Sequence, residues 1–97
     1  MSIKILASAS EDLERGRTFY SQQGEGLGEY FLDSLASDID ALALYAGIHP
    51  KVFGYYRLLS KRFPYAVYYQ INRSHDVIVW RVLDLRQDPF RMQRALK

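Results

Sequence analysis

The chain has 97 residues, of which 48% are hydrophobic and 25% are charged, and it contains no cysteine. This composition predicts one compact domain spanning residues 1–97, and the lack of cysteine excludes a disulfide framework, a thiolate zinc site and a catalytic thiol. Residues 1–56 hold four Lys/Arg against eight Asp/Glu, whereas residues 57–97 hold nine against three. We therefore expect the second part of the chain to face a polyanion or an acidic partner.

The sequence carries no recognisable targeting, membrane or metal-binding signal. No basic-then-apolar signal pattern opens it, and no apolar run approaches the ~20 residues that a membrane span requires. Neither of the two histidines has a second ligand at metal spacing. We expect a cytoplasmic protein without a metal or another cofactor, and no membrane partner.

The first half of the chain has the pattern of one strand and two helices. Alternation over residues 3–7 predicts a short opening strand. Ser8 and Glu11 form a capping-box pattern that begins a helix over residues 8–23. After a glycine-rich turn, apolar residues recur every three to four positions and predict an amphipathic helix over residues 27–46.

The second half is rich in β-branched and aromatic residues. Three runs, over residues 52–59, 65–71 and 77–85, predict strands. A last short helix is then predicted with Pro89 at its first position, and residues 90–97 carry basic side chains toward its C-terminal end. The predicted fold class is α+β, in the order β-α-α-β-β-β, with a helical hairpin on one face of an antiparallel-rich sheet and a short C-terminal helix. The other sheet face is expected to be left open for function.

Several segments, taken together, resemble one known family. They are Asp12-Leu13 at a helix start, Phe19-Tyr20 before the glycine-rich turn, His49-Pro50, Arg57, Arg62-Phe63-Pro64-Tyr65, Tyr68-Tyr69, Val82-Leu83 and Arg86-Gln87-Asp88-Pro89. Their order over nearly the whole chain resembles the RelE/ParE superfamily, the toxins of bacterial type II toxin-antitoxin modules, often labelled plasmid stabilisation proteins. The resemblance implies a growth-inhibiting toxin that a small antitoxin encoded beside it neutralises by wrapping its surface. It leaves two targets open.

RelE-like members bind the ribosome and cleave mRNA without a metal, using the 2′-hydroxyl as the nucleophile. This reaction needs cations to stabilise the phosphate and a group that transfers a proton. Carried over by position, the cationic catalytic set comprises Arg57, Lys61, Arg62, Arg81 and Arg86. The tyrosine, histidine or glutamate that family nucleases use for proton transfer is missing, and the remaining candidates are Tyr69, Asp84 and Asp88.

ParE-like members instead bind DNA gyrase and trap it on cleaved DNA, without catalytic groups of their own. The missing proton-transfer group and the basic tail favour this reading. The residues expected to bind the target are Arg62, Arg86, Phe90, Arg91 and Arg94. A third interpretation, a plain nucleic-acid-binding domain, rests only on arginines that contact phosphates and tyrosines that stack on bases.

Two of these arginines also have a purely structural interpretation. Arg57 and Arg81 lie inside predicted strands, where an arginine is about as often paired with an acid on a neighbouring strand as directed at a substrate. Strict alternation places Arg81 on one strand face with Val79 and Leu83. A charge among apolar neighbours is expected to have a partner or a function.

Overall fold

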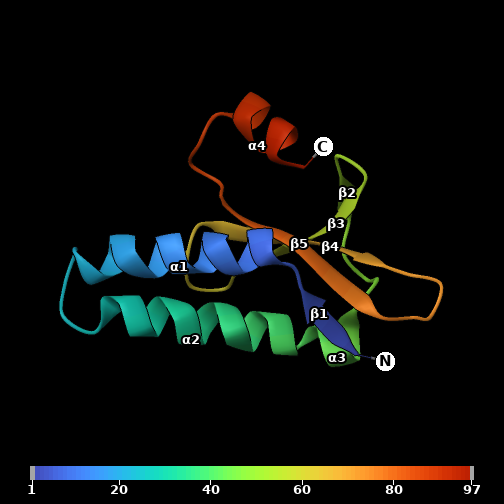
Figure 1. Cartoon of the computed structure of the whole chain (residues 1–97), viewed down its shortest axis with the longest axis horizontal. Helices are drawn as coiled ribbons and strands as arrows, with labels where there is room; N and C mark the ends of the chain where they lie inside the picture. The colour runs from blue at the N-terminus through green and yellow to red at the C-terminus, as the bar shows by residue number, and fades with distance from the viewer. Residues whose placement is uncertain (1, 97) are drawn as a thin grey trace.

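The computed structural model describes residues 2–96 and shows an α+β fold built on one five-stranded sheet (Figure 1). The strands are β1 (Ile3–Ile5), β2 (Lys51–Val52), β3 (Tyr55–Leu59), β4 (Tyr65–Ile71) and β5 (Val77–Asp84). Their order is β1-β5-β4-β3-β2, with β1 parallel to β5 and the other neighbours antiparallel. The predicted fold class is confirmed.

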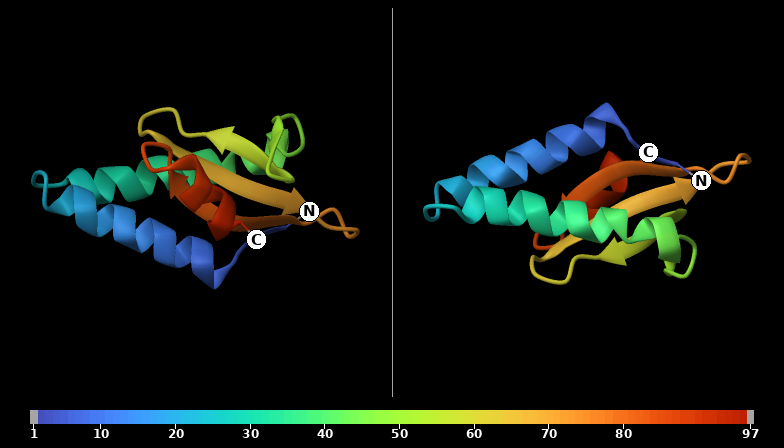
Figure 2. Two further views of the ribbon diagram at one scale, coloured as in Figure 1. Left: turned by 90° about the horizontal axis from the view of Figure 1, so that it is seen from above. Right: turned by 90° about the horizontal axis from the view of Figure 1, so that it is seen from below.

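Helices lie on both faces of the sheet. They are α1 (Ala7–Ser21), α2 (Leu27–Asp40), α3 (Leu42–Tyr45) and α4 (Pro89–Ala95). The long helices α1 and α2 form an antiparallel hairpin on one face, and α4 lies across the other, as the views from above and below show (Figure 2). The expectation of an open sheet face was therefore wrong. Within residues 2–96, no helix is both long and apolar enough to cross a membrane.

Each helical layer buries its own set of apolar side chains. The hairpin core contains Phe31, Leu35, Ile39, Leu42, Tyr65, Val67, Tyr69, Val77, Val79 and Val82. The α4 core contains Ala66, Tyr68, Leu83, Met92 and Leu96. Met92 and Leu96 are four residues apart, so they lie on one side of α4 and bury it against the sheet. This apolar pair explains why the second sheet face is covered.

Two helix predictions were wrong in detail. Helix α1 begins at Ala7 with Leu6 as its N-cap, and no side chain caps it. The Ser8 hydroxyl instead donates to the Trp80 carbonyl oxygen at 2.8 Å, so the expected capping box is absent and Ser8 ties α1 to β5. The long helix expected over residues 27–46 is divided at Ala41 into α2 and the one-turn α3.

The strand expected over residues 52–59 is two strands joined by a tight turn. Phe53 and Gly54 both have positive φ, 57° and 86°, which is the signature of a type I′ hairpin turn. A bulky aromatic residue rarely adopts this conformation, so no sequence pattern signalled the turn. The chain thereby gains β2 as a short edge strand.

A bulge in β5 changes which way its side chains point. Tyr68 lies opposite Arg81 but Tyr69 lies opposite Val79, which leaves Trp80 as an extra residue. Val79 is consequently in the hairpin core and Leu83 in the α4 core. For this reason the expectation that Arg81 shares a strand face with Val79 was wrong, whereas Leu83 lies on the α4 side with Arg81 as expected.

Candidate functional site

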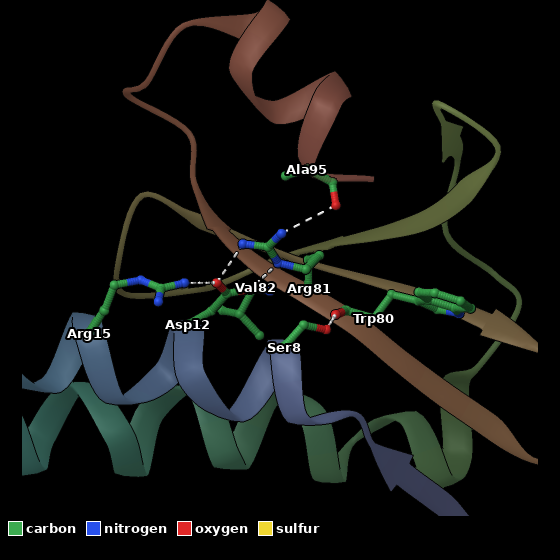
Figure 3. Close-up of polar contacts among 7 residues, drawn as sticks. All are labelled: Ser8, Asp12, Arg15, Trp80, Arg81, Val82 and Ala95. Atoms are coloured by element: carbon green, nitrogen blue, oxygen red, sulfur yellow. Dashed lines mark hydrogen bonds and ion pairs between the residues drawn. The ribbon is translucent and has the colours of Figure 1, made fainter. Parts of the chain in front are cut away.

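A buried carboxylate, Asp12 of α1, is the centre of the main polar cluster (Figure 3). Arg81 donates to it through Nε (2.7 Å) and Nη2 (2.8 Å), in the two-pronged geometry that suits a carboxylate. The backbone N–H of Val82 (2.9 Å) and Nη2 of Arg15 (2.6 Å) complete its partners. Only 3% of the Asp12 side chain is exposed, so these bonds replace the water that the charge has lost.

Arg81 is fully engaged by this cluster. Its third donor, Nη1, bonds the carbonyl oxygen of Ala95 in α4 at 3.2 Å, and 21% of the side chain is exposed. Hydrogen bonding to Asp12 raises the pKa of Arg81 above its ordinary value, so the guanidinium is charged throughout the accessible pH range. It joins α1, β5 and α4, and its charge is neutralised within the fold. Arg81 therefore has an acidic partner, but the acid comes from helix α1 and not, as expected, from a neighbouring strand.

Arg57 and Arg81 flank Tyr68 across the three central strands. Arg57 lies opposite Tyr68 on one side and Arg81 lies opposite it on the other. The Tyr68 side chain is fully buried in the α4 core, and neither its hydroxyl nor Nε of Arg57 has a hydrogen-bond partner within residues 2–96. The three side chains form a row of two cations and a phenol, and α4 packs on Tyr68 and bonds Arg81.

The remaining members of the predicted catalytic set lie elsewhere. Lys61 and Arg62 are exposed in the turn between β3 and β4. Arg86 follows β5 and pairs with Asp84, donating through Nη2 (2.8 Å) and Nε (2.9 Å). Burial alone would raise the pKa of Asp84, but the hydrogen bonds and charge of Arg86 outweigh it and hold that pKa below its usual value. These five cations do not converge on one cleft.

The three candidates for proton transfer are each occupied. The Tyr69 side chain is fully buried in the hairpin core, where its hydroxyl accepts from the Gly47 N–H at 2.9 Å. Asp84 is paired with Arg86 as described. Asp88 caps α4 by accepting from the Phe90 N–H at 2.9 Å. Burial raises the pKa of Tyr69, which disfavours its action as a base at neutral pH.

A cleft of about 290 Å³ lies beside the Asp12 cluster, between α1 and β5. Its walls include Arg15, Phe19, Tyr65 and Asp84. Burial raises the pKa of Tyr65 to about 12, so this phenol is neutral at physiological pH. Within residues 2–96, no three side chains of the metal-ligating types gather closely enough to hold an ion. The cleft therefore offers polar contacts and a protonated phenol near neutral pH.

The predicted target-binding residues include a projecting group on α4, called here the α4 surface: Phe90, Arg91 and Arg94. These side chains lie opposite the buried Met92 and Leu96, and 71% of Phe90 is exposed. Within residues 2–96 neither arginine makes an ion pair. Arg62 and Arg86 lie outside this group, and Lys97, the end of the expected basic tail, lies outside the described residues.

His49 contacts the hydroxyl of Tyr69, which is buried in the hairpin core. Nδ1 of His49 lies 2.5 Å from the Tyr69 hydroxyl, and burial lowers the pKa of His49 below its usual value. The unfolded chain therefore protonates His49 more readily than the folded chain does. The contribution of His49 to the free energy of unfolding should be fully present above about pH 6.5 and should be lost as the pH drops below it. We expect urea unfolding to show lower stability at pH 5.5 than at pH 7.5.

The change His49→Gln should remove most of this pH dependence, and the matched change His75→Gln in the β4–β5 turn should leave it intact. The Asp84 carboxylate does not interfere, because its lowered pKa affects stability only as the pH falls below about 4. An unchanged pH profile in His49→Gln would contradict this assignment.

Sequence reasoning missed the central role of Asp12. The sequence indicated Asp12 only as part of a helix start. A signal was present, because Asp12 follows the buried Ala9 by three residues and precedes the buried Gly16 by four, which places it on the buried face of α1. An acid on such a face requires a cationic partner.

Comparisons with known proteins identify the family. Among curated protein sequences none matches the chain. A solved structure described as "Chromosomal ParDE TA system from P. aeruginosa" shares the fold, with a TM-score of 0.79 and 19% identity over 89% of this chain and 97% of that one. The model of a family described as "ParE toxin of type II toxin-antitoxin system, parDE" matches residues 3–89. The chain therefore belongs to the ParE family and is the toxin of a type II toxin-antitoxin module, with a cognate antitoxin as its partner.

Proposed function

We propose that this toxin inhibits growth by binding DNA gyrase through the α4 surface, and that its cognate antitoxin neutralises it. The observation that supports the proposal most directly is that the Arg81 guanidinium is already hydrogen-bonded within the fold. It is bonded to Asp12 and to Ala95 beneath α4, so it is not free to stabilise the charge of a reacting phosphate. A binding inhibitor needs no such free cation.

The α4 surface has the composition of a binding site. It combines a projecting aromatic ring with two arginines that make no ion pair within residues 2–96. Aromatic and arginine side chains are enriched at protein interfaces, and arginine is common among the residues that dominate the binding energy. The turn that holds Arg62 lies near the segment leading to α4, because the Pro64 carbonyl oxygen accepts from the Leu85 N–H at 2.8 Å. In this proposal Arg62 extends the cationic area toward that segment.

The direct test mixes the purified toxin with gyrase, ATP and supercoiled plasmid. A gyrase poison should accumulate linear plasmid that appears only after the enzyme is denatured and digested, because the cleaved DNA is held by the protein. The same toxin should leave mRNA on a translating ribosome intact. Gyrase that turns over normally at saturating toxin would exclude the proposal.

The alternative target is mRNA, and one observation favours it. The unpartnered Nε of Arg57 and hydroxyl of Tyr68 lie beside Arg81 under α4 and would line a cationic groove if that helix moved. Cleavage of ribosome-bound mRNA that is lost in Arg81→Ala, with the fold preserved, would establish this alternative. We place it second because Tyr69, Asp84 and Asp88 are each engaged elsewhere.

A further inference from the structure

The turn between β2 and β3 contains a strained aromatic residue. Phe53 and Gly54 are its two central residues, with φ of 57° and 86°. A type I′ turn needs positive φ at both positions and therefore favours asparagine, aspartate or glycine there. Gly54 meets this requirement, but the Cβ and ring of Phe53 make positive φ unfavourable. Phe53 therefore lowers the stability of the turn relative to asparagine at the same position.

Contacts within the fold do not explain this choice of residue. Phe53 belongs to neither the hairpin core nor the α4 core, and its ring stacks on no other aromatic ring within residues 2–96. Its exposed fraction is 41%. A Cβ added at Gly54 would meet nothing within 4 Å in the described chain, so the turn projects into solvent. A strained and exposed aromatic residue outside the core is typical of a contact site.

The turn is held beside the C-terminal end of α4. Val52, which precedes Phe53, packs against the α4 core, and the Tyr55 hydroxyl after the turn donates to the Leu96 carbonyl oxygen at 2.8 Å. Figure 1 shows the β2–β3 turn beside this end of the helix. Phe90 lies in the first turn of α4. The two exposed rings, Phe53 and Phe90, are therefore at opposite ends of α4.

The charge near both rings is positive. Residues 51–59 and 89–97 contain no aspartate or glutamate. Lys51, two residues before Phe53, and Arg94, in the last turn of α4, are exposed and make no ion pair in the part of the chain that the structure describes. Such a surface suits an acidic region of a partner protein that also has an apolar pocket for the ring.

We propose that Phe53 is a second aromatic contact of the toxin with gyrase, and that its ring enters an apolar pocket in an acidic gyrase surface while the α4 surface binds alongside. The inference rests on the proposed function and adds the β2–β3 turn to the interface. Asparagine at position 53 would relieve the strain but remove the contact. Stability and gyrase binding should therefore change in opposite directions at this position.

The experiment measures thermal unfolding of the full-length toxin and its affinity for purified gyrase by titration calorimetry. Phe53→Asn should raise the unfolding midpoint, because Asn-Gly is the preferred type I′ pair, and should weaken gyrase binding by about tenfold or more. Phe53→Tyr keeps the ring and should retain wild-type affinity. The matched control is His75→Asn, which makes the same kind of change at a second non-glycine residue with positive φ (63°), in the β4–β5 turn, and should bind gyrase as the wild type does.

Wild-type gyrase affinity in Phe53→Asn would overturn the inference while leaving gyrase as the proposed target. A lower unfolding midpoint in Phe53→Asn would also overturn it, because Phe53 would then stabilise the fold. Loss of affinity only for gyrase bound to DNA would assign the ring to DNA, and loss of affinity for the antitoxin alone would assign it to that partner. Either result would contradict the inference. A wild-type toxin that does not bind gyrase would overturn both the proposed function and the inference.

Discussion

Replacing Asp12 by alanine is expected to lower the free energy of unfolding by about 3–5 kcal/mol, the usual cost of removing one partner from a buried ion pair. The change leaves the Arg81 guanidinium without its carboxylate and the buried Val82 N–H without an acceptor. For a domain of this size the midpoint of thermal unfolding should fall by more than about 12 °C. Urea unfolding followed by Trp80 fluorescence measures the loss.

A double-mutant cycle separates the ion pair from simple loss of packing. Arg81→Met removes the charge but keeps much of the side-chain volume, so adding it to Asp12→Ala should restore part of the stability. Glu11→Ala, at the neighbouring exposed position of α1, is the matched control and should change stability by less than about 0.5 kcal/mol. A loss below about 1 kcal/mol in Asp12→Ala would show that the cluster does not anchor α1 to β5.

If the toxin binds gyrase through the α4 surface as proposed, replacing Phe90 by alanine should weaken that binding by more than about tenfold without changing the fold. The side chain is 71% exposed, so its removal should alter stability by less than about 0.5 kcal/mol. A central aromatic anchor commonly contributes 2 kcal/mol or more to an interface, and each 1.4 kcal/mol is about a factor of ten in affinity. The toxin should accordingly lose most of its ability to stop growth.

Charge reversal on the same helix tests the electrostatic part of the α4 surface. Arg91→Glu with Arg94→Glu should weaken gyrase binding more at low salt than at high salt, because exposed charges act mainly by long-range attraction. Leu44→Ala, an even more exposed apolar residue on the opposite sheet face, should remain as toxic as the wild type. Full toxicity in Phe90→Ala and in the double charge reversal would remove α4 from the target interface.

The predictable parts of the fold were those with a long and regular pattern. Residues 65–71 carry a continuous β-rich run, and β4 has those bounds. The β2–β3 turn was missed because Phe53 adopts a positive φ that its residue type disfavours. The bulge at Trp80 was missed because the prediction assumed that side chains alternate between the two strand faces at every residue, and an extra residue breaks that alternation.

The candidate site was predictable only in its residue types. The sequence indicated that Arg81, among apolar neighbours, has a partner or a function, but not that the partner is Asp12, 69 residues away. Such a contact depends on how α1 lies against β5, which a local pattern does not contain. Likewise, the proline and the basic residues indicated a short C-terminal helix, but not that its apolar residues Met92 and Leu96 pack on Tyr68. Packing of distant segments decided which cations are free.

The most direct test of the proposed target is pulse-labelling of a bacterial culture in which the toxin is induced without its antitoxin. Incorporation of labelled thymidine and labelled amino acids is followed in the same cells over the first minutes. If the toxin acts on gyrase, DNA synthesis should fall first while protein synthesis continues. A fall in protein synthesis that precedes any change in DNA synthesis would contradict the proposal and indicate cleavage of mRNA.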